Sequence, residues 1–270
     1  FRNSTVSGNQ SEFFPNEIVV GATLNQLTTF NRAGDIDDLR VDVLGRIIEI
    51  SGNNMTRSSV DADLEIVRLQ TIGDVRSSTI TTGLLTLGLV GRSMRSSTVA
   101  VSGPLRSLTI SENVVNSNIE VSGPDGRLDL LSVQQNFSGS ISVAGNVGLI
   151  RVVQGNLTGR ILTVANIRGI PGNIDTISVG RDLDVDADIG GTVNQILVGR
   201  HFGSTATTRS FVVHGNIFLI DIPNGQLYDD VRVDQSLTGT LRIGAVSNKP
   251  GDNLLGTGSL YAFGRINNVV

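Results

Sequence analysis

Residues 131–164, LSVQQNFSGSISVAGNVGLIRVVQGNLTGRILTV, carry one pattern written twice. The step Leu131-x-Val133 recurs 19 residues later as Ile150-x-Val152, and a Gly-Asn turn separates the two copies. Repetition at a period of about 20 residues is typical of a solenoid, in which each repeat buries its apolar face against the next. This stretch therefore predicts a repeat fold, and we looked for the same pattern in the rest of the chain.

The apolar step can be followed along most of the sequence. It begins at ten positions: Ile48, Val67, Leu87, Leu108, Leu131, Ile150, Ile177, Ile196, Ile220 and Leu241. A single apolar residue follows each of the first nine steps: Met55, Val75, Met94, Val114, Phe137, Leu157, Leu183, Phe202 and Leu227. Another precedes the next step by three: Leu64, Leu84, Leu105, Leu128, Val147, Ile174, Val193 and Ile217. Alternation at period two is typical of half-buried strands.

These spacings predict an all-β fold, a single-stranded parallel β-helix of about ten coils of roughly 19–24 residues. Left-handed hexapeptide helices need a strict six-residue sub-repeat. The sequence lacks one, which favours right-handed winding. We expect residues 36–244 to form the β-helix, 1–35 an N-terminal arm or end-cover, and 245–270 a C-terminal loop with a possible last strand. Departures from the period predict inserted loops at 123–126, 165–173 and 203–210.

Composition narrows the class of protein. Aromatic residues make up only 4% of the chain, Gly is abundant and Trp is absent, which favours short aliphatic strands and tight turns. The net charge of −4 gives no basic surface for nucleic acid. No cysteine is present, and no apolar run approaches the roughly 18 residues of a membrane span. The chain begins at Phe1 rather than Met, which we take as the start of a processed, exported protein or of a piece of a longer one.

An acidic stretch, RDLDVDADIGG, is the strongest polar constellation. Alternation in a strand would place its carboxylates on one outward face: Asp182, Asp184, Asp186 and Asp188. Ca²⁺ prefers six to eight oxygen ligands, and stacked carboxylates with turn carbonyls could supply some of them. The alternative is a solvated acidic stripe that Arg181 and Arg200 partly neutralise. No other cofactor is indicated.

Catalytic patterns are weak. His201 and His214 have no third partner for zinc, so we expect both on the surface. Asp229-Asp230 and His214-Gly215 distantly resemble elements of polygalacturonase-like enzymes, but they stand in the wrong order. We therefore expect no enzyme.

Five Asn-x-Ser/Thr sequons occur, about as many as chance would give. In a secreted chain they are candidate glycosylation sites. They lie at Asn3, Asn9, Asn54, Asn136 and Asn156.

The coils follow V-x-x-I-x-V-x-x-N-L-x-G-x-I-x-V-x-G-N, and in this they resemble repetitive right-handed parallel β-helix proteins of bacterial surfaces. Haemagglutinin-like adhesins and autotransporter passengers share the period. The Gly-Asn corners are similar to those of large surface proteins of environmental bacteria such as planctomycetes. This resemblance implies an extracellular or cell-surface location and a structural, adhesive or matrix role. It carries no functional residues over to this chain.

We accordingly expect a structural surface protein that forms a fibre, layer or matrix by head-to-tail self-association. Solenoid ends expose strand edges, and residues 13–20 or 259–270 could cover the edge of the next subunit. The alternative is an adhesin or a carbohydrate-binding β-helix module with a glycan as partner, although the scarcity of aromatic rings counts against it. A polysaccharide lyase or hydrolase is a third reading.

Overall fold

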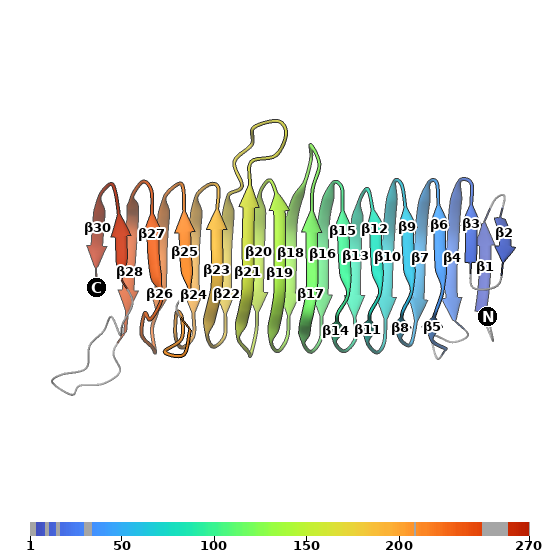
Figure 1. The fold of residues 1–270 in the computed structure, drawn as a ribbon, viewed down its shortest axis with the longest axis horizontal. Coiled ribbons are helices and arrows are strands. Elements are labelled where there is room, and N and C mark those ends of the chain that lie inside the picture. Colours follow the sequence, from blue (N-terminus) through green and yellow to red (C-terminus); the bar gives the residue numbers. More distant parts are fainter. Residues whose placement is uncertain are drawn as a thin grey trace.

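The computed structural model describes residues 4–8, 11–14, 17–29, 34–207, 209–244 and 259–269, and this part of the chain is all-β with no helix. The strands stack into a parallel β-solenoid of about 11 turns with two parallel sheets. Figure 1 shows the coils side by side along the long axis, with the two termini at opposite ends. The predicted fold class is confirmed.

The first sheet receives one strand from each coil. Its 13 strands lie in the order β1 (Ser4–Gly8), β4 (Thr23–Thr29), β7 (Arg46–Gly52), β10 (Glu65–Thr71), β13 (Leu85–Val90), β16 (Pro104–Ile110), β18 (Arg127–Val133), β20 (Val147–Val152), β22 (Ile174–Val179), β24 (Val193–Val198), β26 (Ile217–Ile222), β28 (Leu237–Ile243) and β30 (Ile266–Val269). All neighbours from β4 onward pair in parallel, as strands of successive coils must when each coil runs the same way round.

The second sheet holds 17 strands. In the N-terminal part most coils contribute two short strands, and from β17 onward each contributes one. The strands are β2 (Ser11–Phe14), β3 (Glu17–Val20), β5 (Ile36–Asp37), β6 (Arg40–Val43), β8 (Met55–Thr56), β9 (Ser59–Ala62), β11 (Val75–Arg76), β12 (Thr79–Thr82), β14 (Met94–Arg95), β15 (Thr98–Val101), β17 (Val114–Val121), β19 (Phe137–Ala144), β21 (Leu157–Val164), β23 (Leu183–Ile189), β25 (Ser210–Val213), β27 (Asp230–Val233) and β29 (Leu260–Ala262).

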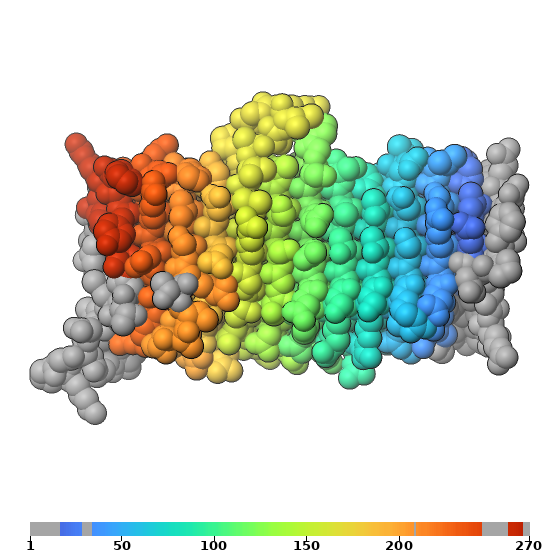
Figure 2. All heavy atoms as spheres, viewed as in Figure 1, coloured from blue at the N-terminus to red at the C-terminus, as the bar shows by residue number. Residues whose placement is uncertain are grey.

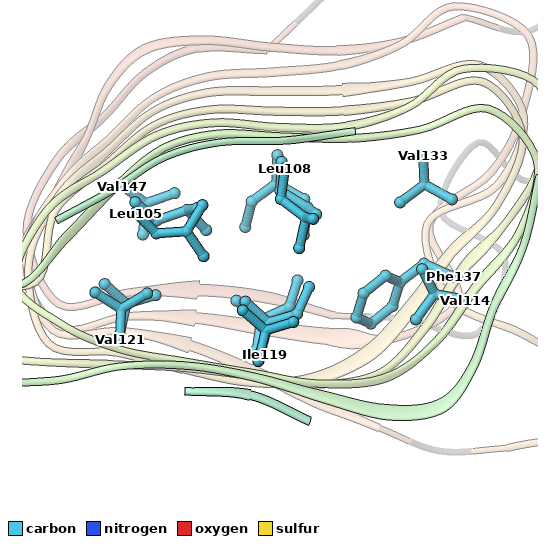
Figure 3. Close-up of a cluster of buried hydrophobic side chains, with 14 of the residues drawn as sticks. Leu105, Leu108, Val114, Ile119, Val121, Val133, Phe137 and Val147 are labelled. Atoms are coloured by element: carbon cyan, nitrogen blue, oxygen red, sulfur yellow. The ribbon is translucent and has the colours of Figure 1, made fainter. Parts of the chain in front are cut away.

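The core lies between the two sheets and consists of stacked aliphatic columns. The nine single apolar residues that follow the steps form one continuous column in the predicted order, from Met55 to Leu227, and each is at most 1% exposed. Figure 3 shows Leu105 and Leu108 of the first sheet facing Val121 and Ile119 of the second. Burying such a side chain contributes roughly 1.5–3 kcal/mol, so stacking supplies most of the stability.

The predicted register is wrong in the first three coils. The structure aligns Leu108 with Gly88, Leu69 and Ile50, whereas the apolar-x-apolar pattern had started those coils at Leu87, Val67 and Ile48. Ile48 is 37% exposed. The predicted register was wrong because small or polar residues occupy inward positions in these three coils. At Gly88 a Cβ atom would lie only 2.7 Å from Leu108 Cδ1, so the neighbouring leucine fills that space instead.

The sequence also predicted a column of apolar residues that lie three positions before each step. This prediction is wrong at two positions. Ile66 and Leu85 point inward in register with Leu105, in place of the predicted Leu64 and Leu84. Leu64 is 63% exposed. The other six predicted members, from Leu105 to Ile217, are buried as expected.

A sharp corner divides the second sheet in the N-terminal coils. It is built on five stacked residues with left-handed backbone: Asp38 (φ 50°), Arg57 (47°), Ser77 (48°), Ser96 (48°) and Asn116 (49°). Such a conformation costs a non-glycine residue roughly 1–2 kcal/mol. The buried serines that follow four of them offset this cost. Ser97 Oγ, for example, donates to Arg95 O at 2.8 Å and accepts the Ser78 N–H at 3.2 Å.

The regular stack extends beyond residues 36–244 on both sides. β3 and β4, which fall in the predicted end-cover, pair in parallel with β6 and β7 and bury Ile18 and Leu24. Outside them β1 and β2 pair antiparallel with β4 and β3. At the other end β29 and β30 pair in parallel with β27 and β28.

The predicted insertions at 123–126 and 165–173 are loops, and the described residues of 203–210 are loop up to Arg209, after which β25 begins at Ser210. The 165–173 loop stands out from one side of the rod beside the 123–126 loop (Figures 1 and 2). Asn166 joins them, because its Nδ2 donates to Pro124 O at 2.8 Å, and Arg168 Nη1 lies 2.6 Å from Asp125 Oδ1. The 203–210 loop connects β23 with β25 on the second sheet.

Candidate functional site

A ladder of polar side chains runs along the solenoid where the first sheet turns into the second. It consists of Asp35, Asn54, Asp74, Ser93, Asn113, Asn136, Asn156, Asp182, His201 and Gln226. A side-chain oxygen or, at His201, Nδ1 accepts the backbone N–H of the next member at 2.8–3.4 Å. We call this set the polar ladder. It provides acceptors for backbone N–H groups in the bend between the first and second sheets.

Three of the predicted glycosylation sites belong to the polar ladder. Asn136 is exposed, and Asn54 and Asn156 are half-buried. The Nδ2 atoms of Asn54 and Asn136 donate to Asp35 Oδ1 at 2.9 Å and Asn113 Oδ1 at 3.1 Å. The ladder gives these asparagines a structural role that needs no glycan. Asn3 and Asn9 lie outside the described residues.

The acidic stretch folds as alternation predicted, with Asp184, Asp186 and Asp188 on the outward face of β23 and Asp182 just before it. Each carboxylate has a basic partner from the next coil. Arg200 Nε donates to Asp182 Oδ1 at 2.7 Å. Arg209 lies between two acids, with Nε 2.8 Å from Asp184 Oδ1 and Nη1 2.9 Å from Asp186 Oδ2.

The predicted calcium site has no preformed cage. Among the described residues, no group of three or more His, Cys, Asp or Glu side chains is arranged to hold a metal ion. The pairing of Asp182 with Arg200 agrees with the alternative of a neutralised stripe. Burial is the largest single influence on the pKa of the Asp182 carboxyl and acts to raise it, but the hydrogen bond and charge of Arg200, with the other contacts, lower it overall. Arg181 lies one coil before Arg200, whose backbone N–H donates to Arg181 O at 2.9 Å. Arg181 is exposed.

The two histidines have distinct environments. His214 bridges three coils: its Nδ1 lies 2.6 Å from Asp234 Oδ2, and its Nε2 lies 3.0 Å from Asp188 Oδ1. The hydrogen bond with Asp234 is the main cause that raises the pKa of His214, although burial opposes it. His201 is half-buried, and its Nδ1 accepts the Gln226 N–H at 3.2 Å. The predicted surface location thus fits His214 better than His201.

Asp229 and Asp230 do not face the same surface. Asp229 is fully buried and Asp230 is exposed. Burial raises the pKa of Asp229 to about 6, and the charges of Asp184 and Asp186 add to the effect. The Arg209 N–H donates to Asp229 Oδ1 at 3.3 Å, whereas Oδ2 has no hydrogen-bond partner. The burial of Asp229 could have been predicted from the sequence, because Asp229 alternates with the buried Val231 and Val233.

A pocket of about 290 Å³ opens beside the end of the acidic stretch. Its lining comes from four coils: Asn156, Thr158, Asp182, Asp184, Arg200, His201, Gly203, Ser204, Thr205 and Tyr228. The rings of His201 and Tyr228 lie 5.3 Å apart at 56° and form one wall. Residues 203–205 of the 203–210 loop form the rim. We call this the ladder pocket, since three of its residues belong to the polar ladder.

The floor and rim of the ladder pocket are held in place. Thr207 Oγ1 donates to Asp184, and Arg209 binds the same carboxylate. Gly203 has a φ of +90°, and a Cβ atom there would lie 2.5 Å from Asp229 Cγ. These contacts hold the 203–210 loop against the neighbouring coils beneath the pocket. A second hollow, of about 590 Å³, is lined by residues that include Arg160, Asp188 and His214.

Comparison with known proteins finds no family model, curated protein or solved structure that matches this chain. The part of the chain that the structure describes contains no helix long and apolar enough to cross a membrane.

Proposed function

We propose that this chain is an extracellular structural protein of a bacterial cell surface and that it assembles end to end into a fibre, layer or matrix. The observation that carries the proposal is the difference between the two ends of the stack. At one end the antiparallel strands β1 and β2 cover the coils. At the other, β29 and β30 pair on one side only within the described residues.

The last described coil also presents apolar side chains. Tyr261 is 61% exposed, Phe263 74% and Ile266 44%. The Arg232 guanidinium lies 5.3 Å from the centre of the Phe263 ring and holds it against the rod. Unpaired strand edges beside exposed rings are sites at which another chain can add. A second copy that offers the outer edges of β1 and β2 would continue both sheets.

The resemblance of the coils to haemagglutinin-like and other surface β-helix proteins supports the extracellular location. The polar ladder supports a structural role, because it uses polar side chains to join coil to coil along most of the rod.

The experiment is sedimentation velocity over a range of concentrations, with negative-stain microscopy of the same samples. The double variant Tyr261→Lys/Phe263→Lys should remain monomeric where the unaltered protein forms filaments or sheets. Leu64→Lys/Ile72→Lys is the matched control, since these side chains are 63% and 50% exposed and flank β10, an inner strand of the stack. It should assemble normally. A protein that is monomeric at every concentration, or a control that abolishes assembly equally, would refute the proposal.

A further inference from the structure

The ladder pocket combines polar groups with an aromatic ring. Residues of four coils and of the 203–210 loop line it, and four of the eleven Phe and Tyr residues lie between Phe202 and Tyr228. Phe202 and Phe211 pack edge to face beneath this region, with ring centres 5.1 Å apart and no exposure to solvent. Because this core, the polar ladder and the clamps on Asp184 fix the walls, the pocket exists before any ligand arrives.

The charges in the ladder pocket are already balanced. Asp182 is paired with Arg200, and Asp184 with Arg209. The Asp182 side chain is only 14% exposed and that of Asp184 only 15%, so removal of either partner would leave a largely desolvated charge. An anionic ligand would compete for Arg200 and a cationic one for Asp182. The pocket therefore favours a neutral ligand.

The groups that remain are hydrogen-bonding groups and a ring face. Because His201 Nδ1 accepts the Gln226 N–H, the proton of the neutral ring lies on Nε2, which has no partner among the described residues. Asp182 and Asp184 keep spare acceptor capacity, since a carboxylate has about four lone-pair sites. Tyr228 adds a ring whose hydroxyl is already bonded to Gln226.

We propose that the ladder pocket binds one residue of a neutral sugar. A pyranose combines hydroxyls, which can donate to the carboxylates and accept from His201, with an apolar ring face that can contact Tyr228. At about 290 Å³ the pocket lies at the small end of ligand sites and suits a single ring rather than a long oligosaccharide. The site would give the rod a means to hold neutral glycan. It is independent of the proposed end-to-end assembly.

The chain offers matched variants for the test. Tyr228→Ala in the pocket can be compared with Phe218→Ala, which removes a 45% exposed ring outside both the pocket and the proposed assembly surface. His201→Asn removes the Nε2 donor and the ring but keeps an acceptor for the Gln226 N–H. Asn136 and Asn156 show that asparagine fits the polar ladder. Thermal melting of each variant establishes that it is folded.

The measurement is saturation-transfer NMR, followed by calorimetric titration of the full chain. The probes are the methyl glycosides of glucose, galactose and mannose, with methyl glucuronoside, methyl glucosaminide and uridine as comparators. We expect at least one neutral glycoside to bind, with affinity at least 10-fold lower in Tyr228→Ala and His201→Asn and unchanged in Phe218→Ala.

Three results would overturn the proposal. These are no binding of any neutral glycoside, tighter binding of the glucuronoside, glucosaminide or uridine, and binding that survives both pocket variants. Assembly is scored separately by sedimentation, so failure of one proposal leaves the other intact.

Discussion

The Nδ1 atom of His214 lies 2.6 Å from Oδ2 of Asp234, one coil further along the solenoid. The same ring reaches back to Asp188 at 3.0 Å. One side chain thus bridges three successive coils of the second sheet, which only stacking brings together. Arg232 also binds Asp234, and Arg160 and Asp186 border the neighbouring hollow.

This contact predicts that the stabilising contribution of His214 is lost as pH rises above the pKa of the unfolded state. The folded-state pKa of His214 is raised, so its contribution is complete below about 6.5, the unfolded value, and is lost as pH rises through the folded pKa. The side chain is 48% exposed, so solvent screening limits the effect to about 0–1 kcal/mol. Urea unfolding from pH 5.5 to 8.5 measures it. His214→Gln should flatten this part of the profile, and an unchanged slope would contradict the assignment.

Asp229 predicts a second pH dependence. Its folded pKa is raised to about 6, so its stabilising influence is present below the unfolded value of 3.8 and is lost as pH rises through 6. A shift of this size corresponds to about 3 kcal/mol. Asp229→Asn removes the buried charge but keeps an acceptor for the Arg209 N–H. Its stability relative to the unaltered protein should therefore improve as pH rises from 4 to 8. A difference that stays constant with pH would show that Asp229 does not ionise in this range.

The columns of the core could be read from the sequence because most inward positions carry apolar residues at a regular spacing. The column from Met55 to Leu227 is the clearest case. The prediction failed where inward positions carry small or polar residues and apolar residues lie outside. The inward positions are Gly52, Thr71 and Gly88, and the outer residues are Ile48, Val67 and Leu87. Hydropathy alone could not separate the two faces there. The handedness of the winding stays a prediction.

The site was harder to predict, because its contacts join residues on different coils. The local pattern did place the carboxylates of β23 on one face, but their partners Arg209 and His214 depend on the length of the 203–210 insertion. The polar ladder had a usable signal. In all ten cases, from Asp35-Ile36 to Gln226-Leu227, a hydrogen-bonding residue immediately precedes a buried apolar residue. These apolar residues are Ile36 and the column that runs from Met55 to Leu227.

The polar ladder predicts a specific ranking of substitutions at Asn136. Asn136→Ala removes the acceptor for the Asn156 N–H and should cost about 0.5–1.5 kcal/mol of unfolding free energy, since water can reach this exposed donor. Asn136→Ser should cost less, because Ser93 fills the same position in its own coil. Urea denaturation gives the ranking, and hydrogen exchange at the Asn156 amide should be faster in the alanine variant alone. Equal stability of the two variants would deny the ladder an energetic role.

Gly139 lies in β19, the first strand of the second sheet after β17, and the left-handed corner residue is absent from it. It lies opposite Ser117, and a Cβ atom on it would come within 2.1 Å of Ser117 O. Gly139→Ala should therefore destabilise the protein by about 1–3 kcal/mol or more, since the backbone of the stacked coil has to move. Gly169→Ala is the matched control. Its φ is +73°, but a Cβ atom meets nothing within 4 Å, so it should cost only the left-handed strain of about 1 kcal/mol. Chemical denaturation of both variants separates steric crowding between coils from local backbone strain, and a larger loss at Gly169 would mean that crowding does not limit this position.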